Sequence, residues 1–454
     1  MSKFYDRKLC SAQTPQGTIT LTGIFIPFFL EMFLMNFMGT VNTFMLSYFS
    51  DDAVAAVGAA SQFAGMAVTF YAVIGTGASI VISHSLGAGN KEHASDAALT
   101  ALIFGGLFSL LISIAASAFS KPFMLFMHLE GAVLCDAALY FKICMRFSFL
   151  QALISIIGSV FKSYGLPKIS VSVSLGMNVI NAFLNYLVIF HPSAAPLHGV
   201  SGIAWCNIIS KAAGLCAMAF LLYRLPLGLD FKHSLPRCLH MLYPVLKTGI
   251  PGGISTLSYN ISQTVTTSII ALSGPAAVSA KIYVSNLVFY VYVLGMSLGL
   301  STSLMIGWLS GAGKFEQAYR LNLQNLKITL LLNSVLSALL FLFGHPLLSL
   351  FTADPAILKA GRSLLFLDIF VEIFRGFNHI EENSLRGAGD TVYPMAVSIC
   401  SCWLMSVLFS YLLSVKAGLG LNGCWIAFAM DEAFRGIQYY FRWRSRKWMK
   451  KALA

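Results

Sequence analysis

The sequence predicts an all-α polytopic membrane protein with twelve transmembrane helices in two parallel six-helix repeats. Three observations predict this fold class: an apolar composition, twelve long apolar stretches and an internal repeat. Of the 454 residues, 57% are hydrophobic and 11% are charged, and the mean hydropathy is +0.75. A soluble domain carries roughly 25% charged residues, so lipid must replace much of the water around this chain.

The apolar stretches recur along the whole chain, and each is long enough for a crossing of about 20 residues. We expect spans at residues 20–46, 54–80, 96–120, 136–162, 168–190, 198–224, 244–271, 276–308, 325–350, 357–384, 393–415 and 420–442. A β-barrel would show short alternating segments instead. The polar N-terminus and the lack of a small-residue cleavage site argue against a signal peptide.

The basic residues are distributed unevenly between the two predicted sides of the membrane. The net charge is +12, with 30 Lys and Arg against 18 Asp and Glu. With a cytoplasmic N-terminus, 20 basic residues fall in inner segments and four in outer ones: Lys121, Lys359, Arg362 and Lys416. The positive-inside rule therefore predicts a multi-pass cell-membrane protein with both termini cytoplasmic. We expect the basic tail to contact anionic membrane lipid, and we expect no nucleic-acid partner.

An internal repeat relates the two halves of the chain. The tripeptide Gly-Ala-Gly at 87–89 recurs at 311–313, an offset of 224 residues, and Pro27 recurs at the same offset as Pro251. Towards the end the offset shortens by three, so that Gly199 matches Gly420. Both Gly-Ala-Gly segments follow a long helix and are typical of a helix end with a turn.

Six spans per half is an even number, so both halves enter the membrane in the same orientation and the repeat is parallel. We expect an N-lobe at 1–225, a cytoplasmic linker at 226–243 and a C-lobe with a basic tail at 244–454. Two similar bundles joined by one linker suit alternating access, with substrate bound between them.

Several motifs in this order resemble those of the multidrug and toxic compound extrusion (MATE) family. They are the Ala-Val-Ala-Ala-Val-Gly run at 53–58, the Gly-Ala-Gly-Asn loop at 87–90, Leu-Arg-Gly-Ala-Gly-Asp-Thr at 385–391 and Gly-Leu-Asn-Gly-Cys-Trp-Ile-Ala at 420–427. The resemblance covers nearly the whole chain. It implies two six-helix lobes in a V shape that export organic cations or other amphipaths in exchange for protons or sodium.

The chain departs from the family pattern at the N-lobe cation site. Many members carry an acid in a Val-Asp-Thr pattern of the first span, where this chain has Asn42. Some members add an Asn-x-x-x-Asp pair in the fifth span, where this chain has Asn181 and Asn185, and a Thr of the sixth span is replaced by Asn207. Amides and hydroxyls alone make a weak site for a hard cation, so sodium binding there is disfavoured.

Glu31 is the favoured ion-coupling residue, because it is the only acid well inside the first six predicted spans. An ionisable group at membrane depth is costly and is a functional hypothesis by default. A buried acid that exchanges protons is what proton coupling needs. The structural alternative is a protonated Glu that hydrogen-bonds a neighbouring helix.

Polar and Met side chains predict a substrate cavity on the first, fifth and seventh spans. Met35, Met38 and Asn42 follow Glu31 at i+4, i+7 and i+11, so they share one helix face. The full predicted set is Met35, Met38, Asn42, Asn181, Asn185, Tyr259, Asn260 and Gln263. Polarisable and polar stripes of this kind suit an amphipathic cation. The alternative is that Met packs against lipid and the hydroxyls bond within their own helix.

The tenth span carries a second candidate for ion coupling. Asp368 and Glu372 are four residues apart, and Glu372 and Arg375 are three apart, close enough to pair. The offset of 224 gives Cys144 and Ser148 in the first half, so these acids have no counterpart there. Asp368 and Glu372 are therefore the reserve coupling site, with a structural Glu–Arg pair as the alternative.

No cofactor, metal or catalytic constellation is evident. The glycine-rich loops lack the Lys-Ser/Thr ending of a P-loop, so the expected energy source is an ion gradient rather than a nucleotide. Nine scattered cysteines lack metal-ligand spacing. The sequence thus predicts a MATE-like antiporter and not an enzyme, with a small organic solute and protons or sodium as partners. Two alternatives remain: a lipid-linked saccharide flippase, favoured by Lys142, Arg146 and Lys211, and a non-transporting membrane subunit.

Overall fold

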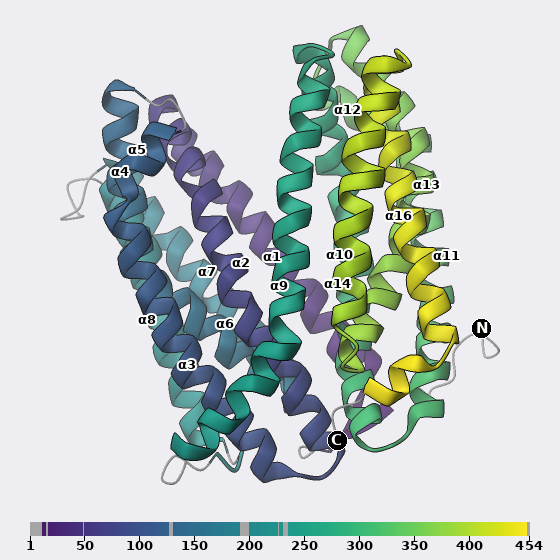
Figure 1. Ribbon diagram of the computed structural model, residues 1–454. Helices are drawn as coiled ribbons and strands as arrows, with labels where there is room; N and C mark the ends of the chain where they lie inside the picture. Colours follow the sequence, from purple (N-terminus) through teal and green to yellow (C-terminus); the bar gives the residue numbers. More distant parts are fainter. Residues whose placement is uncertain are drawn as a thin grey trace. The chain divides into compact units, whose positions relative to one another are not determined.

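The computed structural model describes residues 11–14, 17–48, 50–126, 130–190, 199–225, 227–229 and 235–451. The predicted linker at 226–243 and both predicted cytoplasmic termini lie partly outside these residues. A two-stranded antiparallel hairpin, β1 (Ser11–Thr14) and β2 (Gly17–Thr20), precedes the first helix and was not predicted. Nearly all the other described residues are helical (Figure 1), so the all-α fold class is confirmed.

The first half contains six predicted spans formed by eight helices (Figure 1). They are α1 (Leu21–Ser47), α2 (Asp51–Gly87), α3 (Lys91–Ala118), α4 (Ser120–Phe126), α5 (Gly131–Arg146), α6 (Ser148–Ser163), α7 (Pro167–Phe190) and α8 (Gly199–Arg224). The short α4 lies between spans. The loop after α2 has the predicted turn, since Gly89 has a φ of +78° and the Asn90 side chain caps α3.

The second half repeats this order. Its α-helices are α9 (Leu235–Ala271), α10 (Pro275–Gly311), α11 (Phe315–Leu342), α12 (Gly344–Ser349), α13 (Pro355–Gly387), α14 (Val392–Ser401), α15 (Phe409–Tyr411) and α16 (Gly420–Arg444). A π-helical segment, Cys402–Leu408, joins α14 to α15, and a second, Leu412–Lys416, continues α15 to the end of the same span. A 3₁₀ turn, Lys447–Lys451, follows α16.

The structure reproduces the sequence repeat in the bounds of several helices. The bounds of α2 and α10 differ by 224 residues at both ends, and so do those of α3 and α11. The interval of α13 matches that of α5 and α6 together, but the first half is broken at Phe147, where the two helices bend by 44°. The single span predicted at 136–162 is therefore corrected to a bent pair.

The predicted span at 325–350 is also corrected. The helix α11 begins ten residues earlier, at Phe315, and ends at Leu342, after which α12 forms a separate turn. Its first turns carry polar side chains that the hydropathy pattern placed in a loop. Glu316 and Arg320 of these turns are exposed and pair with each other, whereas Asn322 is buried and donates to the Ser384 hydroxyl on α13 at 2.9 Å.

Eight helices among the described residues are long and apolar enough to cross a membrane, and the bent α5–α6 pair makes nine. The remaining three predicted spans correspond to α9, α13 and α16. These three are less apolar because they carry polar and charged side chains. Two of them, α13 and α16, position the candidate site.

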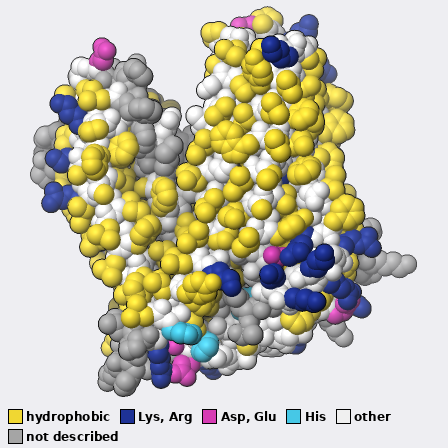
Figure 2. Space-filling view, viewed as in Figure 1, with side chains coloured by type: hydrophobic (Ala, Val, Ile, Leu, Met, Phe, Trp, Pro, Cys, Tyr) yellow, Lys and Arg dark blue, Asp and Glu magenta, His cyan; other side chains and the backbone are white. Residues whose placement is uncertain are grey.

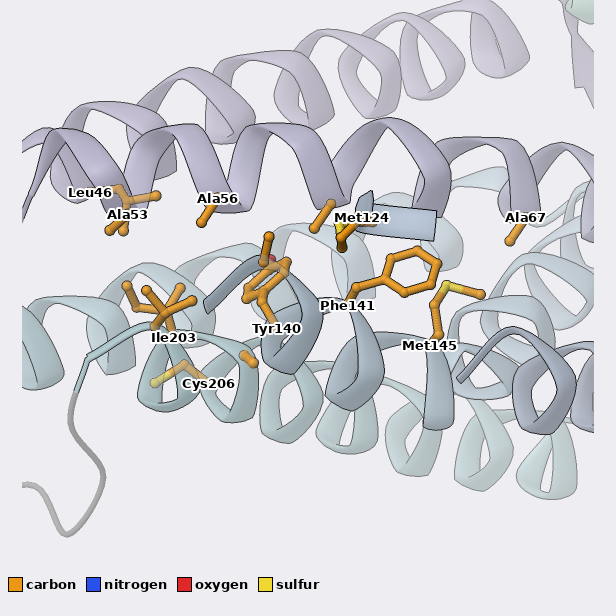
Figure 3. Close-up of a cluster of buried hydrophobic side chains, with 14 of the residues drawn as sticks. Leu46, Ala53, Ala56, Ala67, Met124, Tyr140, Phe141, Met145, Ile203 and Cys206 are labelled. Carbon is orange, nitrogen blue, oxygen red and sulfur yellow. The ribbon is translucent and has the colours of Figure 1, made fainter. Parts of the chain in front are cut away.

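The chain divides into two compact units. One unit comprises residues 30–86 and 90–253, and its α2, α5 and α8 contribute an apolar core that includes Ala56, Tyr140, Phe141 and Ile203 (Figure 3). The other unit comprises residues 1–29, 87–89 and 254–454. We call these the N-terminal and C-terminal units.

The centre of the C-terminal unit is α13, which packs against α10, α11 and α16. Gly299 on α10 allows a close crossing, because a β-carbon there would clash with the carbonyl oxygen of His379 on α13. Exposed large hydrophobic side chains such as Leu331, Phe366 and Leu404 cover the outside of this unit. Figure 2 shows this apolar surface, with Lys and Arg side chains gathered towards the end where α16 finishes. Such a surface is suited to lipid along the middle of the helices and to water and headgroups at their ends.

Candidate functional site

A cluster of buried charges occupies the C-terminal unit, on α13 and α16. The helix α13 contributes Asp368, Glu372 and Arg375, which follow at i, i+4 and i+7 and so share one face. Glu372 is fully buried, and Asp368 is 4% exposed. On α16 the cluster members are Asp431, Glu432 and Arg435, each buried as well.

Ion pairs connect five of these six side chains into one chain. Arg375 pairs with Glu372 on its own helix, and its Nε lies 3.2 Å from Oε1 of Glu432 on α16. Arg435 lies 3.1 Å from Glu432 and 2.7 Å from Asp431. Glu432 is thus held between two guanidinium groups, one from each helix. Buried charges need such partners because removing them from water is expensive.

Neutral donors complete the coordination of the carboxyl groups. The indole N–H of Trp425 donates to Oδ1 of Asp368 at 3.1 Å. The Asn333 amide on α11 donates to Oε2 of Glu372 at 3.4 Å, and Ser401 donates to Oδ1 of Asp431 at 2.6 Å. Asp368 has no ion-pair partner among the described residues, so it is the acid of the cluster that depends on neutral donors alone.

The cluster carries more acids than bases. Four carboxyl groups face two guanidinium groups, and Lys281 of α10 lines the same cavity, so full ionisation would leave one excess negative charge in the interior of a membrane protein. Uncompensated charge is strongly disfavoured there. A bound proton or monovalent cation would relieve this excess, and so would a cationic solute.

Two cavities open onto the cluster. The first, of about 270 Å³, is lined by Asp368, Arg375 and Glu432 together with Tyr259 and Gln263 of α9. The second, of about 190 Å³, shares Tyr259, Arg375 and Glu432 with the first. The structure therefore brings the predicted coupling residue Asp368 together with the predicted cavity residues Tyr259 and Gln263. Asn260, also predicted for the cavity, is exposed and lines neither of these two cavities.

Glu31, the favoured coupling residue from the sequence, is paired with a base. Its Oε2 lies 2.8 Å from Nζ of Lys162 on α6, and Ser170 on α7 donates to its Oε1 at 3.4 Å. The side chains of Glu31 and Lys162 are 15% and 18% exposed. Glu31 is thus joined to a base on another helix, whereas the sequence prediction placed no base beside it.

The predicted amides of the N-terminal unit form an uncharged network. Asn185 donates to Asn42 and to Asn181, each at 3.2 Å, and Asn181 donates to Ser210 on α8 at 3.4 Å. Met35 is 60% exposed, and Met38 is half-buried. The structure thus brings Asn42, Asn181 and Asn185 together.

Sequence reasoning missed Glu432, the residue at the centre of the ion-pair chain. Glu432 lies three residues before Arg435, and the same i,i+3 spacing predicted the pair of Glu372 with Arg375. The adjacent Asp431 lies four residues before the same Arg435, which is also a pairing distance on a helix. The same spacing rule, applied to both acids, would have found Glu432.

The repeat, the helical spans and the buried charges together define a multi-pass membrane transporter. The MatE family profile matches residues 27–187 and 251–412, and the two matches begin 224 residues apart, the offset of the internal repeat. The chain belongs to this family. Members of the family are transporters and not enzymes, so the prediction that the chain is no enzyme is confirmed.

Two curated relatives match almost the full chain. An uncharacterized transporter, YisQ, of Bacillus subtilis is 35% identical over 441 residues, which is 96% of each chain. A probable multidrug resistance protein, NorM, of Thermotoga maritima is 24% identical over 99% of this chain and 97% of its own length. The resemblance to MATE transporters inferred from the motifs is therefore confirmed.

Solved structures share the fold. An outward-facing multidrug resistance MATE transporter has a TM-score of 0.87 at 20% identity and covers 95% of this chain and 96% of its own. A MOP-superfamily transporter from Pyrococcus furiosus, described with a binding pocket of reversed polarity, has a TM-score of 0.85 at 19% identity with the same coverage. The fold class of twelve spans in two repeats is confirmed, and the membrane location is that of a multi-pass protein.

Proposed function

We propose that this chain is a secondary active exporter that exchanges organic solutes for protons, and that the coupling groups are Asp368 and Glu372. The observation that carries the proposal is the excess of buried carboxyl groups beside two cavities in the C-terminal unit. Protonation would neutralise the excess when the solute is absent, and a cationic solute would neutralise it when the proton leaves. Competition of this kind for the same charge is sufficient to couple two fluxes.

The surroundings of the acids favour a proton over sodium. Asp368 accepts from the Trp425 N–H, and Glu372 is bonded by Arg375 and by the Asn333 amide. These neighbours are donors, whereas a sodium site would need several converging oxygen ligands. One proton moving through roughly 100 mV supplies about 2.3 kcal/mol, which sustains a solute ratio on the order of fifty.

The N-terminal candidate Glu31 is a weaker choice for coupling. Lys162 already neutralises its charge, so the pair has no net charge for a proton or a cationic solute to balance. The flippase alternative is also less supported, because two of the three bases that favoured it, Lys142 and Arg146 on α5, are exposed side chains, and only Lys211 on α8 is half-buried. We further propose the cell membrane as the location, with both termini cytoplasmic and with anionic lipid against the exposed Lys447, Lys450 and Lys451.

Efflux of a fluorescent organic cation from proteoliposomes, driven by a pH gradient or by a sodium gradient, tests the proposal. We expect wild-type flux to follow the pH gradient, and Asp368→Asn or Glu372→Gln to lower it by on the order of tenfold or more. Cys144→Ala is the matched control, since Cys144 occupies the repeat position of Asp368 in the first half.

Glu31→Gln discriminates between the two units. Abolished flux in Glu31→Gln, with normal flux in Asp368→Asn and Glu372→Gln, would contradict the assignment and move coupling to the N-terminal unit. Flux driven by sodium alone would contradict the proton. Wild-type protein that moves no solute under either gradient would contradict the exporter itself.

A further inference from the structure

A second set of buried polar side chains lies where α10, α11 and α13 pack together in the C-terminal unit. Its five members share an exposed fraction of 0%, and we call them the Glu381 cluster: Thr302, Asn322, Asn325, Glu381 and Ser384. The Asn322 amide donates to Oε2 of Glu381 at 3.2 Å and to the Ser384 hydroxyl at 2.9 Å. The Asn325 amide donates to the Thr302 hydroxyl at 2.8 Å. Hydrogen bonds of the cluster thus join α11 to both of its neighbours.

Glu381 is a fully buried carboxyl group that has no base beside it in the described part of the chain. Its neighbour Glu382 pairs with Arg386, whereas none of the ion pairs among the described residues includes Glu381. Glu382 also lines the 190 Å³ cavity, and Glu381 lines neither of the two cavities beside the charged cluster. A buried carboxylate without a positive charge beside it is strongly disfavoured. Glu381 therefore requires either a cation or a proton.

Three oxygen atoms of the Glu381 cluster accept no hydrogen bond from the described residues. They are Oε1 of Glu381, Oδ1 of Asn322 and Oδ1 of Asn325. Asn322 and Asn325 are three residues apart on α11, so they are neighbours on one helix face. A proton would convert Oε1 into a donor and would satisfy at most one of the two amide oxygens. A cation can bind all three oxygens and also balances the carboxylate, so it explains more of the cluster than a proton does.

The first half of the chain shows that these positions do not need polar side chains in order to pack. At the offset of 224, the five residues correspond to apolar ones on α2, α3 and α6: Ala78, Ala98, Ala101, Ile157 and Val160. All five of these side chains are buried as well. The same helix positions are thus filled there by hydrophobic side chains that leave no oxygen unpaired. The polar residues of the second half therefore have a role other than packing, and their unpaired oxygens fit the binding of a cation.

We propose that the Glu381 cluster binds one sodium ion, which neutralises Glu381 and holds α11 against α10 and α13. One carboxylate balances one positive charge, whereas a divalent cation would leave an excess charge in a fully buried site. The helices pack closely here, because a β-carbon at Gly387 of α13 would clash with the Ser303 carbonyl oxygen on α10, and close packing favours sodium over the larger potassium ion. The inference goes beyond the proposed exchange of solute and proton: this ion lies outside both cavities, stabilises the C-terminal unit and does not drive transport.

Binding of radioactive sodium to purified full-length protein in lipid nanodiscs tests the inference. We expect one saturable site per chain in wild-type protein, and we expect Glu381→Gln to abolish it. Asp368→Asn and Glu372→Gln are the matched controls, because they remove acids of the charged cluster, and we expect both to keep the site. Asn325→Ala introduces the residue of the first half and removes one oxygen ligand while the carboxylate stays. We expect it to weaken sodium binding by on the order of tenfold.

Thermal unfolding gives a second readout of the same site. We expect the unfolding midpoint of wild-type protein to rise, and then to level off, as sodium chloride replaces N-methylglucamine chloride at constant ionic strength, because an ion that binds only the folded state stabilises it. In Glu381→Gln we expect the same midpoint in both salts, since the neutral amide needs no cation.

Wild-type protein that binds no sodium and unfolds at the same midpoint in both salts would overturn the inference, and Glu381 would then hold a proton. Sodium binding that survives in Glu381→Gln but disappears in Asp368→Asn would also overturn it, because the ion would then belong to the charged cluster. If Glu381→Gln does not fold, Asn325→Ala decides the question: an unchanged affinity for sodium would show that Asn325 is no ligand and would overturn the proposed site.

Discussion

The two halves of the chain share one scaffold and differ in their buried chemistry. At the offset of 224, Asp368 and Glu372 of the second half correspond to Cys144 and Ser148 of the first. At the shorter offset of 221, which relates Gly199 to Gly420, Glu432 corresponds to Lys211. The central acid of the C-terminal cluster is thus a base in the N-terminal unit. The two halves therefore have helices at equivalent positions but carry different charges at those positions.

The difference extends to the packing. In the N-terminal unit, the region of α5 and α8 is an apolar cluster that includes Tyr140, Phe141 and Cys206 (Figure 3). In the C-terminal unit, the equivalent helices α13 and α16 face each other through ion pairs. The apolar cluster stabilises the N-terminal bundle by hydrophobic packing. The ion pairs of the C-terminal unit place charged side chains inside a membrane protein, which costs free energy and is typical of a functional site.

Removal of one base from the C-terminal cluster should have the largest effect. Arg435→Met leaves Asp431 and Glu432 buried without this partner, and we expect a loss of about 3–5 kcal/mol in stability. The measurement is the thermal unfolding midpoint and the yield of monodisperse protein in detergent. Gly214 is the counterpart in the first half, so that unit has no such dependence.

A compensated variant is the control for Arg435→Met. Asp431→Asn, Glu432→Gln and Arg435→Met together remove the charges on both sides, and we expect most of the lost stability to return. Full stability in the single variant would show that the acids are already neutral without Arg435, and the ion-pair description of the cluster would then be incorrect.

The fold could be predicted well where the sequence marks the ends of helices. The Gly-Ala-Gly loops fixed the ends of α2 and α10, because a turn with positive φ favours glycine there. The break at Phe147 could not be predicted, since Arg146, Phe147 and Ser148 include no Pro or Gly. The break depends on contacts with other helices, which a local pattern does not contain.

A single methyl group should distinguish the packing of the two halves. Gly299 and Gly75 occupy the same repeat position. A β-carbon at Gly299 would clash with the His379 carbonyl oxygen, whereas one at Gly75 would lie 3.2 Å from the movable Ser159 hydroxyl. We expect Gly299→Ala to cost about 1–3 kcal/mol and Gly75→Ala less than about 1 kcal/mol.

Thermal unfolding midpoints of the two glycine variants, measured side by side, check this difference. Each variant serves as the control for the other because the chemical change is identical. Equal losses would mean that the α10–α13 crossing relaxes as easily as the crossing of α2 with α6, and the C-terminal unit would then be no more tightly packed than its partner.

The residues of the candidate site could be predicted from the sequence because an ionisable side chain inside a membrane costs free energy and therefore indicates a function. That rule alone identified Asp368, Glu372 and Glu31. It could not show that Glu31 pairs with Lys162, which lies 131 residues away on another helix. Spacing rules find partners on one helix, such as Glu372 and Arg375, but partners between helices depend on the tertiary fold.

The smallest expected effect concerns Ser148, at the position that Glu372 occupies in the second half. Its hydroxyl bonds the Tyr71 hydroxyl at 2.6 Å and the Ser113 hydroxyl at 2.7 Å, directly after the break at Phe147. Side-chain hydrogen bonds between membrane helices average about 0.6 kcal/mol. We therefore expect Ser148→Ala to cost about 1 kcal/mol, measured by thermal unfolding.

A double-mutant cycle that combines Ser148→Ala with Tyr71→Phe isolates the free energy of the hydrogen bond between these two hydroxyls, which is the larger part of the expected loss. We expect a coupling of about 0.6 kcal/mol between the two substitutions, because each removes the same hydrogen bond. A coupling near zero would mean that the hydroxyl pair contributes nothing to the bend. The bend would then follow from packing of Phe147 against Trp205, whose ring centroids lie 5.6 Å apart. In that case the difference between the bent α5–α6 pair and the straight α13 would originate in an aromatic contact rather than in the polar residues that distinguish the two halves.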